Sequence, residues 1–311
     1  MRENDRQDKL GLQKKSHDAM RRGRCQWRHG GCELSGGSEL AGECRIRLIV
    51  VVLGGGNVYV ACSTLCFARR PLEEALQIIA DMRFAKVDLA IHEDSSHVKP
   101  TQVAADVPRT AQMLKSLCPL GLAAFHVRIE TEEPVEYDRQ FRAICRLARL
   151  LLVPLVCIDA PSTQTPLEVT LDRLKSLVRI AHAEGIIPTV ETLTGTWTEM
   201  PETAVELCQR IPGLGLTLDP SHYLVGPARG NSFDAVYPFV RHVRLRDTGA
   251  GPHEFQVRVG QGHVDYGKII TYLTKHRYDR LLTVDIRDVA DSSFAMEPEV
   301  RKLKYLLESL I

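Results

Sequence analysis

The feature that most limits the possible folds is a regular alternation that begins near residue 57 and continues to the C-terminus. Short apolar runs of strand length alternate with longer amphipathic stretches, and one such pair takes roughly thirty residues, about the size of a strand–helix unit. Eight pairs follow one another, and no GxGxxG turn is present after the first run. This pattern predicts a (β/α)8 TIM barrel over residues 58–311 rather than an open doubly wound sheet.

Three acidic residues stand at the ends of predicted strands. Glu191, Asp219 and Asp285 each come directly after a short apolar run, and His222 lies three residues beyond Asp219. A single acid in such a place is more often a helix cap than a ligand. Because all strands of a parallel barrel end at the same face, however, three of them indicate one shared site.

Residues 1–47 lack the alternation. They are rich in charged residues, Gly and Gln, and cannot bury enough apolar surface to offset the entropy of ordering. We therefore predict a disordered arm or a non-native upstream extension. A zinc knuckle is an alternative for this segment, but its spacing lacks a paired CxxC pattern, so we favour chance for the candidate ligands Cys25, His29, Cys32 and Cys44.

The composition limits the partners and the compartment. A hydrophobic fraction of 44% suits a large core, and a net charge of +1 gives no field that would recruit nucleic acid or an anionic membrane. Most cysteines lie in apolar segments, which is typical of reduced thiols and favours a cytoplasmic protein. A lipoprotein signal running from Arg45 to Cys62 is a weaker alternative, because glycines at 54–56 interrupt its apolar part. We expect a small-molecule partner and leave a homo-oligomer open.

Four motifs follow one another in a characteristic order: Leu218–His222, His242–Asp247, Val259–Tyr266 and Tyr278–Asp285. Each is weak alone, but the ordered set resembles the xylose-isomerase-like TIM-barrel superfamily, and in particular its sugar phosphate isomerase/epimerase branch. The resemblance covers about residues 58–311. It implies a divalent metal at the barrel mouth, held by Glu, Asp, His and Glu from strands five to eight.

The chain keeps only part of the ligand set that this resemblance implies. Glu191 and Asp219 match the first two positions. Arg244 stands where the family has its metal-binding histidine, and a guanidinium cannot coordinate a cation. Asp285 replaces the last Glu and is one methylene shorter. His222 could supply an imidazole instead, as the same motif does in related endonucleases.

The resemblance implies an isomerase or epimerase that moves a proton next to a carbonyl of a sugar or polyol. Glu191, Asp219, His222 and Asp285 would hold Mn²⁺, Mg²⁺ or Zn²⁺, and Glu191 and Asp285 would form the acid/base pair. Five further side chains are expected to contact the substrate, although a structural role is the alternative for the histidines: His92, His126, His242, Arg244 and Arg246.

Two other functions stay open. An inward-facing Arg244 would place a fixed positive charge where relatives hold the metal, which would give a metal-free binding module or a catalytically silent relative. An apurinic endonuclease-like DNA repair enzyme is a weaker alternative, because the charge is neutral and the histidine set of those enzymes is incomplete.

Overall fold

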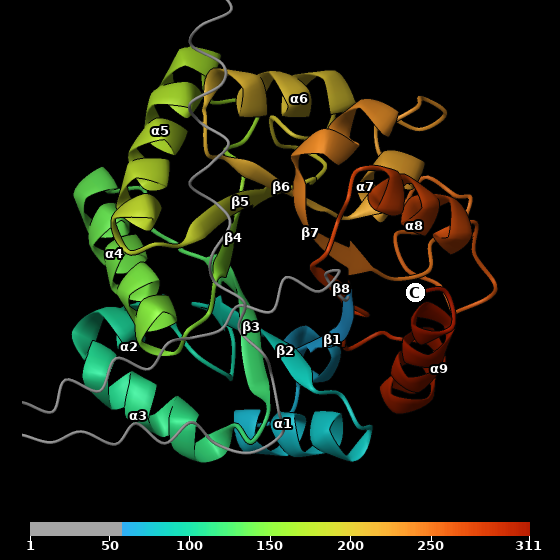
Figure 1. Ribbon diagram of the computed structural model, residues 1–311, viewed down its shortest axis with the longest axis horizontal. Helices are drawn as coiled ribbons and strands as arrows, with labels where there is room; N and C mark the ends of the chain where they lie inside the picture. Colours follow the sequence, from blue (N-terminus) through green and yellow to red (C-terminus); the bar gives the residue numbers. More distant parts are fainter. Residues whose placement is uncertain (1–57) are drawn as a thin grey trace, which may run out of the picture. The chain divides into compact units, whose positions relative to one another are not determined.

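The computed structural model describes residues 58–311, which form a closed barrel of parallel strands (Figure 1). Each strand pairs with the next in sequence and β8 pairs with β1, so the sheet has no open edge. The predicted (β/α)8 fold is confirmed. The strands are β1 (Tyr59–Ser63), β2 (Lys86–His92), β3 (Gly121–Arg128), β4 (Leu155–Asp159), β5 (Ile187–Glu191), β6 (Gly215–Leu218), β7 (Val240–Leu245) and β8 (Leu281–Val284).

Residues 1–57 lie outside the described range. The predicted arm of residues 1–47 and the zinc alternative within it therefore stay predictions. Cys62, the end point of the lipoprotein alternative, is a buried free thiol inside β1.

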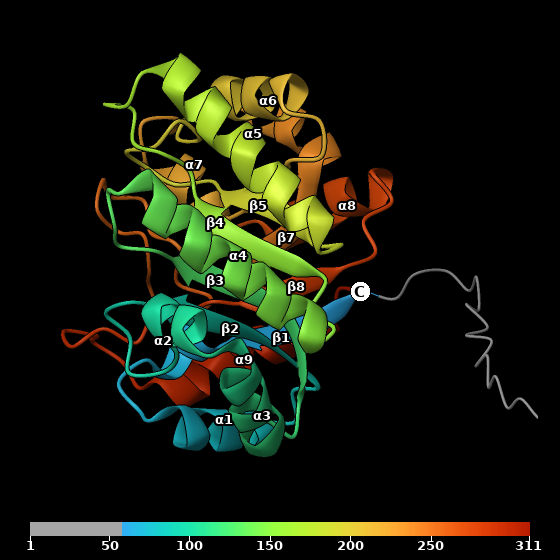
Figure 2. The ribbon, with the colours of Figure 1, turned by 90° about the vertical axis from the view of Figure 1, so that its left-hand side faces the viewer.

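The helices lie on the outside of the barrel, as the side view shows (Figure 2). In the described part of the chain, no helix is both long enough and apolar enough to cross a membrane. The α-helices are α1 (Leu72–Asp81), α2 (Pro100–Ala105), α3 (Val107–Leu117), α4 (Pro134–Leu150), α5 (Leu167–Ala183), α6 (Pro201–Arg210), α7 (Pro220–Val225), α8 (Tyr266–Lys275) and α9 (Met296–Glu308), with 3₁₀-helices η1 (Thr64–Phe67) and η2 (Asp234–Phe239).

Two predicted helices differ in the structure. The sequence pattern predicts one helix over residues 101–117, but Asp106 separates α2 from α3. The Asp106 carboxylate accepts a hydrogen bond from the Arg109 backbone N–H at 2.9 Å, and Pro108 lies in the first turn of α3, so a new helix starts there. The helix predicted over residues 233–239 is the 3₁₀-helix η2.

The short helix α7 follows β6 directly and was not predicted. Asp219 is its N-cap and accepts a hydrogen bond from the Ser221 backbone N–H at 3.0 Å, while Pro220 occupies the first position. This turn places Ser221 and His222 beside the carboxylate that ends β6.

Alternate residues of each strand point into the barrel, and many of these are polar. The hydroxyls of Thr189 and Thr217 lie 2.7 Å apart, and His242 Nε2 lies 2.8 Å from the Thr283 hydroxyl. The main apolar core contains residues of the strands and of the surrounding helices, such as Val156 and Leu174. The barrel interior therefore holds polar side chains that lead up to the carboxyl ends of the strands.

Candidate active site

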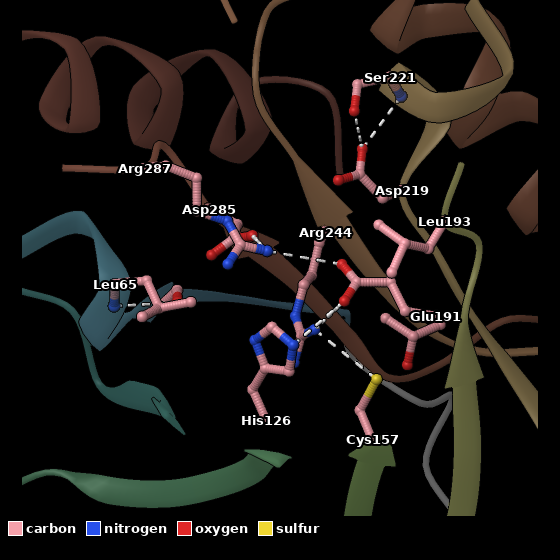
Figure 3. Close-up of polar contacts among 12 residues, drawn as sticks. Leu65, His126, Cys157, Glu191, Leu193, Asp219, Ser221, Arg244, Asp285 and Arg287 are labelled. Atoms are coloured by element: carbon pink, nitrogen blue, oxygen red, sulfur yellow. Dashed lines mark hydrogen bonds and ion pairs between the residues drawn. The ribbon is translucent and has the colours of Figure 1, made fainter. Parts of the chain in front are cut away.

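Glu191, Asp219 and Asp285 meet at the carboxyl ends of β5, β6 and β8 (Figure 3). Each offers a carboxylate oxygen within 4.8 Å of the other two, and each residue is only 1% exposed. A buried carboxylate without a partner costs several kcal/mol in lost hydration. Arginine side chains from β7 and from the segment after β8 supply the opposite charge.

Arg244 lies inside the barrel and is completely buried. Its Nε and Nη2 atoms each lie 2.9 Å from Asp88 Oδ2, and its Nη1 lies 3.0 Å from Glu191 Oε2 and 3.6 Å from Cys157 Sγ (Figure 3). Burial alone would lower the pKa of Arg244, but the carboxylates of Asp88 and Glu191 raise it well above its usual value. From the sequence, Arg244 was expected to lie beside Glu191, Asp219 and Asp285. In the structure it pairs with Glu191 and with Asp88.

Both oxygens of Asp219 are already bonded. Arg246 Nη2 donates to Oδ2 at 2.6 Å, and the backbone N–H and hydroxyl of Ser221 donate to Oδ1 at 3.0 and 2.6 Å. Arg246 also donates to the Ser221 hydroxyl from Nε and Nη2. Asp219, Ser221 and Arg246 thus form a closed group with little capacity left for another ligand.

His222 lies next to this group. The Thr194 backbone N–H donates to His222 Nδ1 at 3.3 Å, and burial lowers the pKa of the ring, which favours its neutral form. Nε2 in turn lies 3.8 Å from Asp219 Oδ2 and 3.3 Å from Arg246 Nη2. The Thr194 N–H and the Arg246 guanidinium, which are both donors, therefore already face the two ring nitrogens.

Arg287 joins the other two acids. Its Nη2 lies 2.9 Å from Asp285 Oδ2 and 3.7 Å from Glu191 Oε1 (Figure 3). Its side chain is 25% exposed, far more than the carboxylates that it contacts. Within the described residues, Glu191 Oε1 and both oxygens of Asp285 accept no hydrogen bond. The most open part of this acid cluster is therefore at Arg287.

Two of the predicted histidines lie on the other side of Glu191. His126 Nε2 is 3.1 Å from Glu191 Oε2 and 3.9 Å from Asp159 Oδ1, and Asp159 also pairs with Arg128 at 3.1 Å. The ring of His92 packs edge-on against His126, with centroids 4.5 Å apart. Burial and the neighbouring His126 lower the pKa of His92, so this ring stays neutral.

His242 lies deeper in the barrel and is completely buried. It contacts the hydroxyls of Thr283 and Thr217, and its Nε2 is 3.7 Å from Asp88 Oδ2. Burial lowers its pKa to about 4, although Asp88 acts in the opposite direction. It is a neutral ring next to Asp88, the acid that pairs with Arg244.

The two proposed acid/base carboxylates are ionised at neutral pH. Burial raises the pKa of Glu191, but Arg244 and His126 outweigh it and hold the pKa well below the usual range. Burial also raises the pKa of Asp285, and the charges of Arg287 and Arg244 hold it below its usual value. Both groups are therefore ionised, and the lowered pKa makes each a weaker base than a free carboxylate.

A divalent cation does not fit this arrangement well. The three carboxylates converge closely enough to hold one, but guanidinium nitrogens or Ser221 occupy both oxygens of Asp219 and one of Glu191. Arg287 Nη2 lies at ion-pair distance from Asp285 and close to Glu191. Five carboxylates of the cluster already face four guanidiniums: Asp88, Asp159, Glu191, Asp219 and Asp285 against Arg128, Arg244, Arg246 and Arg287.

Several site residues were missed from the sequence. Asp88 is an acid in an otherwise apolar stretch of β2, and Asp159 ends β4, next to Glu191 in the sheet. Arg287 follows Asp285 by two residues in the segment after β8, and its Nη2 lies 2.9 Å from Asp285 Oδ2. Two sequence features could have identified these residues. One is a charged residue within a buried strand, and the other is a charged residue two positions after an acid that ends a strand.

The closed barrel of parallel strands is a TIM barrel. Its buried acids lie at the carboxyl ends of the strands, where TIM-barrel enzymes have their active sites. The chain belongs to the xylose isomerase-like TIM barrel family, whose family model matches residues 77–308. A search of curated proteins finds no match.

Solved structures of the same architecture include several proteins with sugar-related names. A D-tagatose 3-epimerase-like protein is 16% identical (TM-score 0.62; 81% of this chain and 98% of that chain covered). A 3-keto-D-glucoside 4-epimerase from E. coli is 13% identical (0.62; 81% and 100%). A xylose isomerase-like TIM barrel protein from Mycobacterium smegmatis in complex with magnesium is 15% identical (0.62; 82% and 98%). At these identities the likeness shows the fold alone.

Proposed function

We propose that this chain is a sugar isomerase or epimerase that moves a proton at a carbon next to a carbonyl, with Glu191 and Asp285 as the acid/base pair. One observation carries the proposal. Glu191 Oε1 and Asp285 Oδ1 are buried and accept no hydrogen bond in the described part of the chain, and Asp285 Oδ2 has only its ion-pair contact of 2.9 Å with Arg287, although the two carboxylates belong to one cluster. Buried acceptors are normally satisfied, so these oxygens are available to a reacting group.

The chemistry follows from these two carboxylates. One carboxylate removes the proton from the carbon, and the C–H electron pair forms a C=C bond while the carbonyl oxygen takes on negative charge. In an isomerase the protonated carboxyl gives this proton to the neighbouring carbon, and the hydroxyl proton of the first carbon moves to the former carbonyl oxygen. In an epimerase the other carboxyl group, protonated from solvent, gives a proton to the opposite face of the same carbon. A positioned acid/base group of this kind contributes about 10²–10⁴-fold to the rate.

The names of the structural relatives agree with this proposal. The D-tagatose 3-epimerase-like protein and the 3-keto-D-glucoside 4-epimerase carry names of reactions that invert a carbon of a sugar. We extend only the substrate class, a small carbohydrate or polyol, to this chain.

The test is deuterium exchange. The purified protein is incubated in D₂O with D-fructose, D-tagatose and D-fructose 6-phosphate, and NMR follows loss of the proton next to the carbonyl. Asp285→Asn should lower the exchange rate about 10²–10⁴-fold. The matched control is Asp172→Asn, whose side chain is 81% exposed on α5 and should leave the rate unchanged. Equal rates for wild type and Asp285→Asn would refute the assignment.

A second candidate is a metal-free binding module, and one contact favours it. Arg244 engages Glu191 Oε2 inside a buried ion-pair network, which restrains the carboxylate that would have to move a proton. Calorimetric titration with the same sugars separates the two functions. Binding without deuterium exchange supports the module, whereas exchange supports the enzyme.

A further inference from the structure

Arg287 differs from the other two arginines that contact the acid cluster. All three side-chain nitrogens of Arg244 lie within 3.0 Å of a carboxylate oxygen, and Arg246 uses Nε and Nη2 to hold Ser221 and Asp219. Arg287 contacts the cluster through Nη2 alone. Its Nε is buried and has no hydrogen-bond partner among the described residues.

The free Nε–H lies on the edge of the guanidinium that can bind two acceptor oxygens. Nε–H and one Nη2–H lie side by side in a planar fork, which can hold two oxygens at once. In Arg287 this edge adjoins Asp285 Oδ2 and Glu191 Oε1, the carboxylates with unbonded oxygens. Unsatisfied buried donors and acceptors therefore lie together next to Arg287, whose side chain is partly exposed.

We propose that Arg287 is a catalytic residue that takes the place of the divalent cation and binds the carbonyl oxygen and the adjacent hydroxyl of an α-hydroxycarbonyl substrate. The proposal rests on the proposed function and adds the recognised chemical unit, two oxygens on neighbouring carbons of a sugar. It also assigns the electrophile to Arg287 rather than to Arg244, which is enclosed by Asp88 and Glu191.

The step balances without a metal. Asp285 or Glu191 takes the proton from carbon, the C–H pair becomes the C=C bond, and the carbonyl π pair moves onto the oxygen held by Arg287. Burial alone would lower the pKa of Arg287, but Asp285 and Glu191 raise it, so the guanidinium keeps its protons and stabilises the oxyanion through hydrogen bonds. The carboxyl group that took the proton then returns it to carbon, and the electron pair on the oxyanion re-forms the carbonyl bond.

Arg287 has to shift when a substrate binds, and its partial exposure to solvent gives it room to do so. Arg287 is the most exposed of the three guanidiniums in contact with Glu191, Asp219 or Asp285, at 25% against 0% for Arg244 and 6% for Arg246. A substrate can therefore displace the single Nη2 contact to Asp285 without opening the buried network below it.

The first experiment compares Mn²⁺ binding by calorimetry and electron paramagnetic resonance, after chelator treatment, in wild type, Arg287→Ala and Arg287→Lys. We expect no Mn²⁺ site in wild type or Arg287→Lys, and a site in Arg287→Ala that is lost when Asp285→Asn is added. Arg173→Ala is the control, because Arg173 is similarly exposed at 23% and pairs with Asp138 away from the site. Equally tight Mn²⁺ binding by wild type and Arg287→Ala would overturn the proposal.

The second experiment measures deuterium exchange with the three ketoses named above, in chelator. Arg287→Ala should lose about 100-fold in rate, the usual cost of removing one oxyanion donor, and added guanidinium ion should restore part of it. Rates within threefold of wild type, or a wild-type rate that requires Mn²⁺, would overturn the catalytic role. If wild type exchanges no proton of any of the three, the proposed function fails, whereas the Mn²⁺ comparison still decides whether Arg287 holds the cation position.

Discussion

Arg244→Ala should destabilise the barrel by about 3–5 kcal/mol, because it removes the guanidinium that pairs with two buried carboxylates. Arg244 and Asp88 are 0% exposed and Glu191 is 1% exposed, so water cannot take over the lost interaction. For a domain of this size each kcal/mol shifts the midpoint of thermal unfolding by about 2–4 °C, so a loss of roughly 10 °C is expected.

Urea unfolding followed by circular dichroism gives the free energy directly. Arg128→Ala is the control: Arg128 also pairs with an acid, Asp159, but its side chain is 40% exposed, and the cost should stay below about 1 kcal/mol. A similar cost for the two variants would refute our assignment of Arg244 as the buried counter-charge.

The pH dependence offers an independent check on the same variant. In wild type the pKa of Glu191 lies well below its usual value, so its contribution to stability is present above the unfolded carboxyl pKa, about 4.3, and is lost as the pH falls through the folded pKa. Without Arg244, burial is no longer fully offset and the pKa of Glu191 rises. The difference in unfolding free energy between wild type and Arg244→Ala should therefore be largest at neutral pH and shrink towards pH 4.

Four further predictions follow from the sequence and the site. Arg244→His should lower the unfolding free energy measured in urea, because Asp88 and Glu191 lose the guanidinium that pairs with both; unchanged stability would contradict the role given to Arg244. Because the pKa values of Glu191 and Asp285 are both lowered, the deuterium exchange rate should stay constant from pH 7 down to about 4, and a fall between 6 and 5 would contradict this. Deleting residues 1–47 should leave the melting temperature nearly unchanged, and a loss of several degrees would show that they pack. Asp106→Ala should cost about 1 kcal/mol by urea unfolding through loss of the α3 cap, and no loss would argue against that cap.

The barrel could be predicted from the sequence because the strand–helix pattern is local and is repeated along the chain. Apolar runs, helix caps and the regular spacing act within one strand–helix unit, and Glu191 and Asp285 could be placed at strand ends in the same way. The break at Asp106 was missed because the apolar period continues across it while the cap and Pro108 interrupt the backbone.

The charge partners could not be predicted, because they depend on contacts far apart in the chain. Arg244 was expected to face the acid cluster, but its pairing with Asp88 joins residues separated by 156 positions. Arg287 belongs to none of the motifs on which the family resemblance rests. Its position next to Asp285 and Glu191 becomes visible only in the folded barrel. Motifs alone therefore do not show which carboxylate oxygens are already paired with arginine.

The long-range pairing of Arg244 also bears on how the chain reaches its native state. Asp88 belongs to β2 and Glu191 to β5, whereas their counter-charge is carried by β7. An assembly of the first five strands would bury two carboxylates before this guanidinium arrives, at a cost of several kcal/mol for each ion. We therefore expect intermediates made of the N-terminal half of the barrel to be disfavoured until β7 supplies Arg244, whose contact with Asp88 closes a loop of 156 residues.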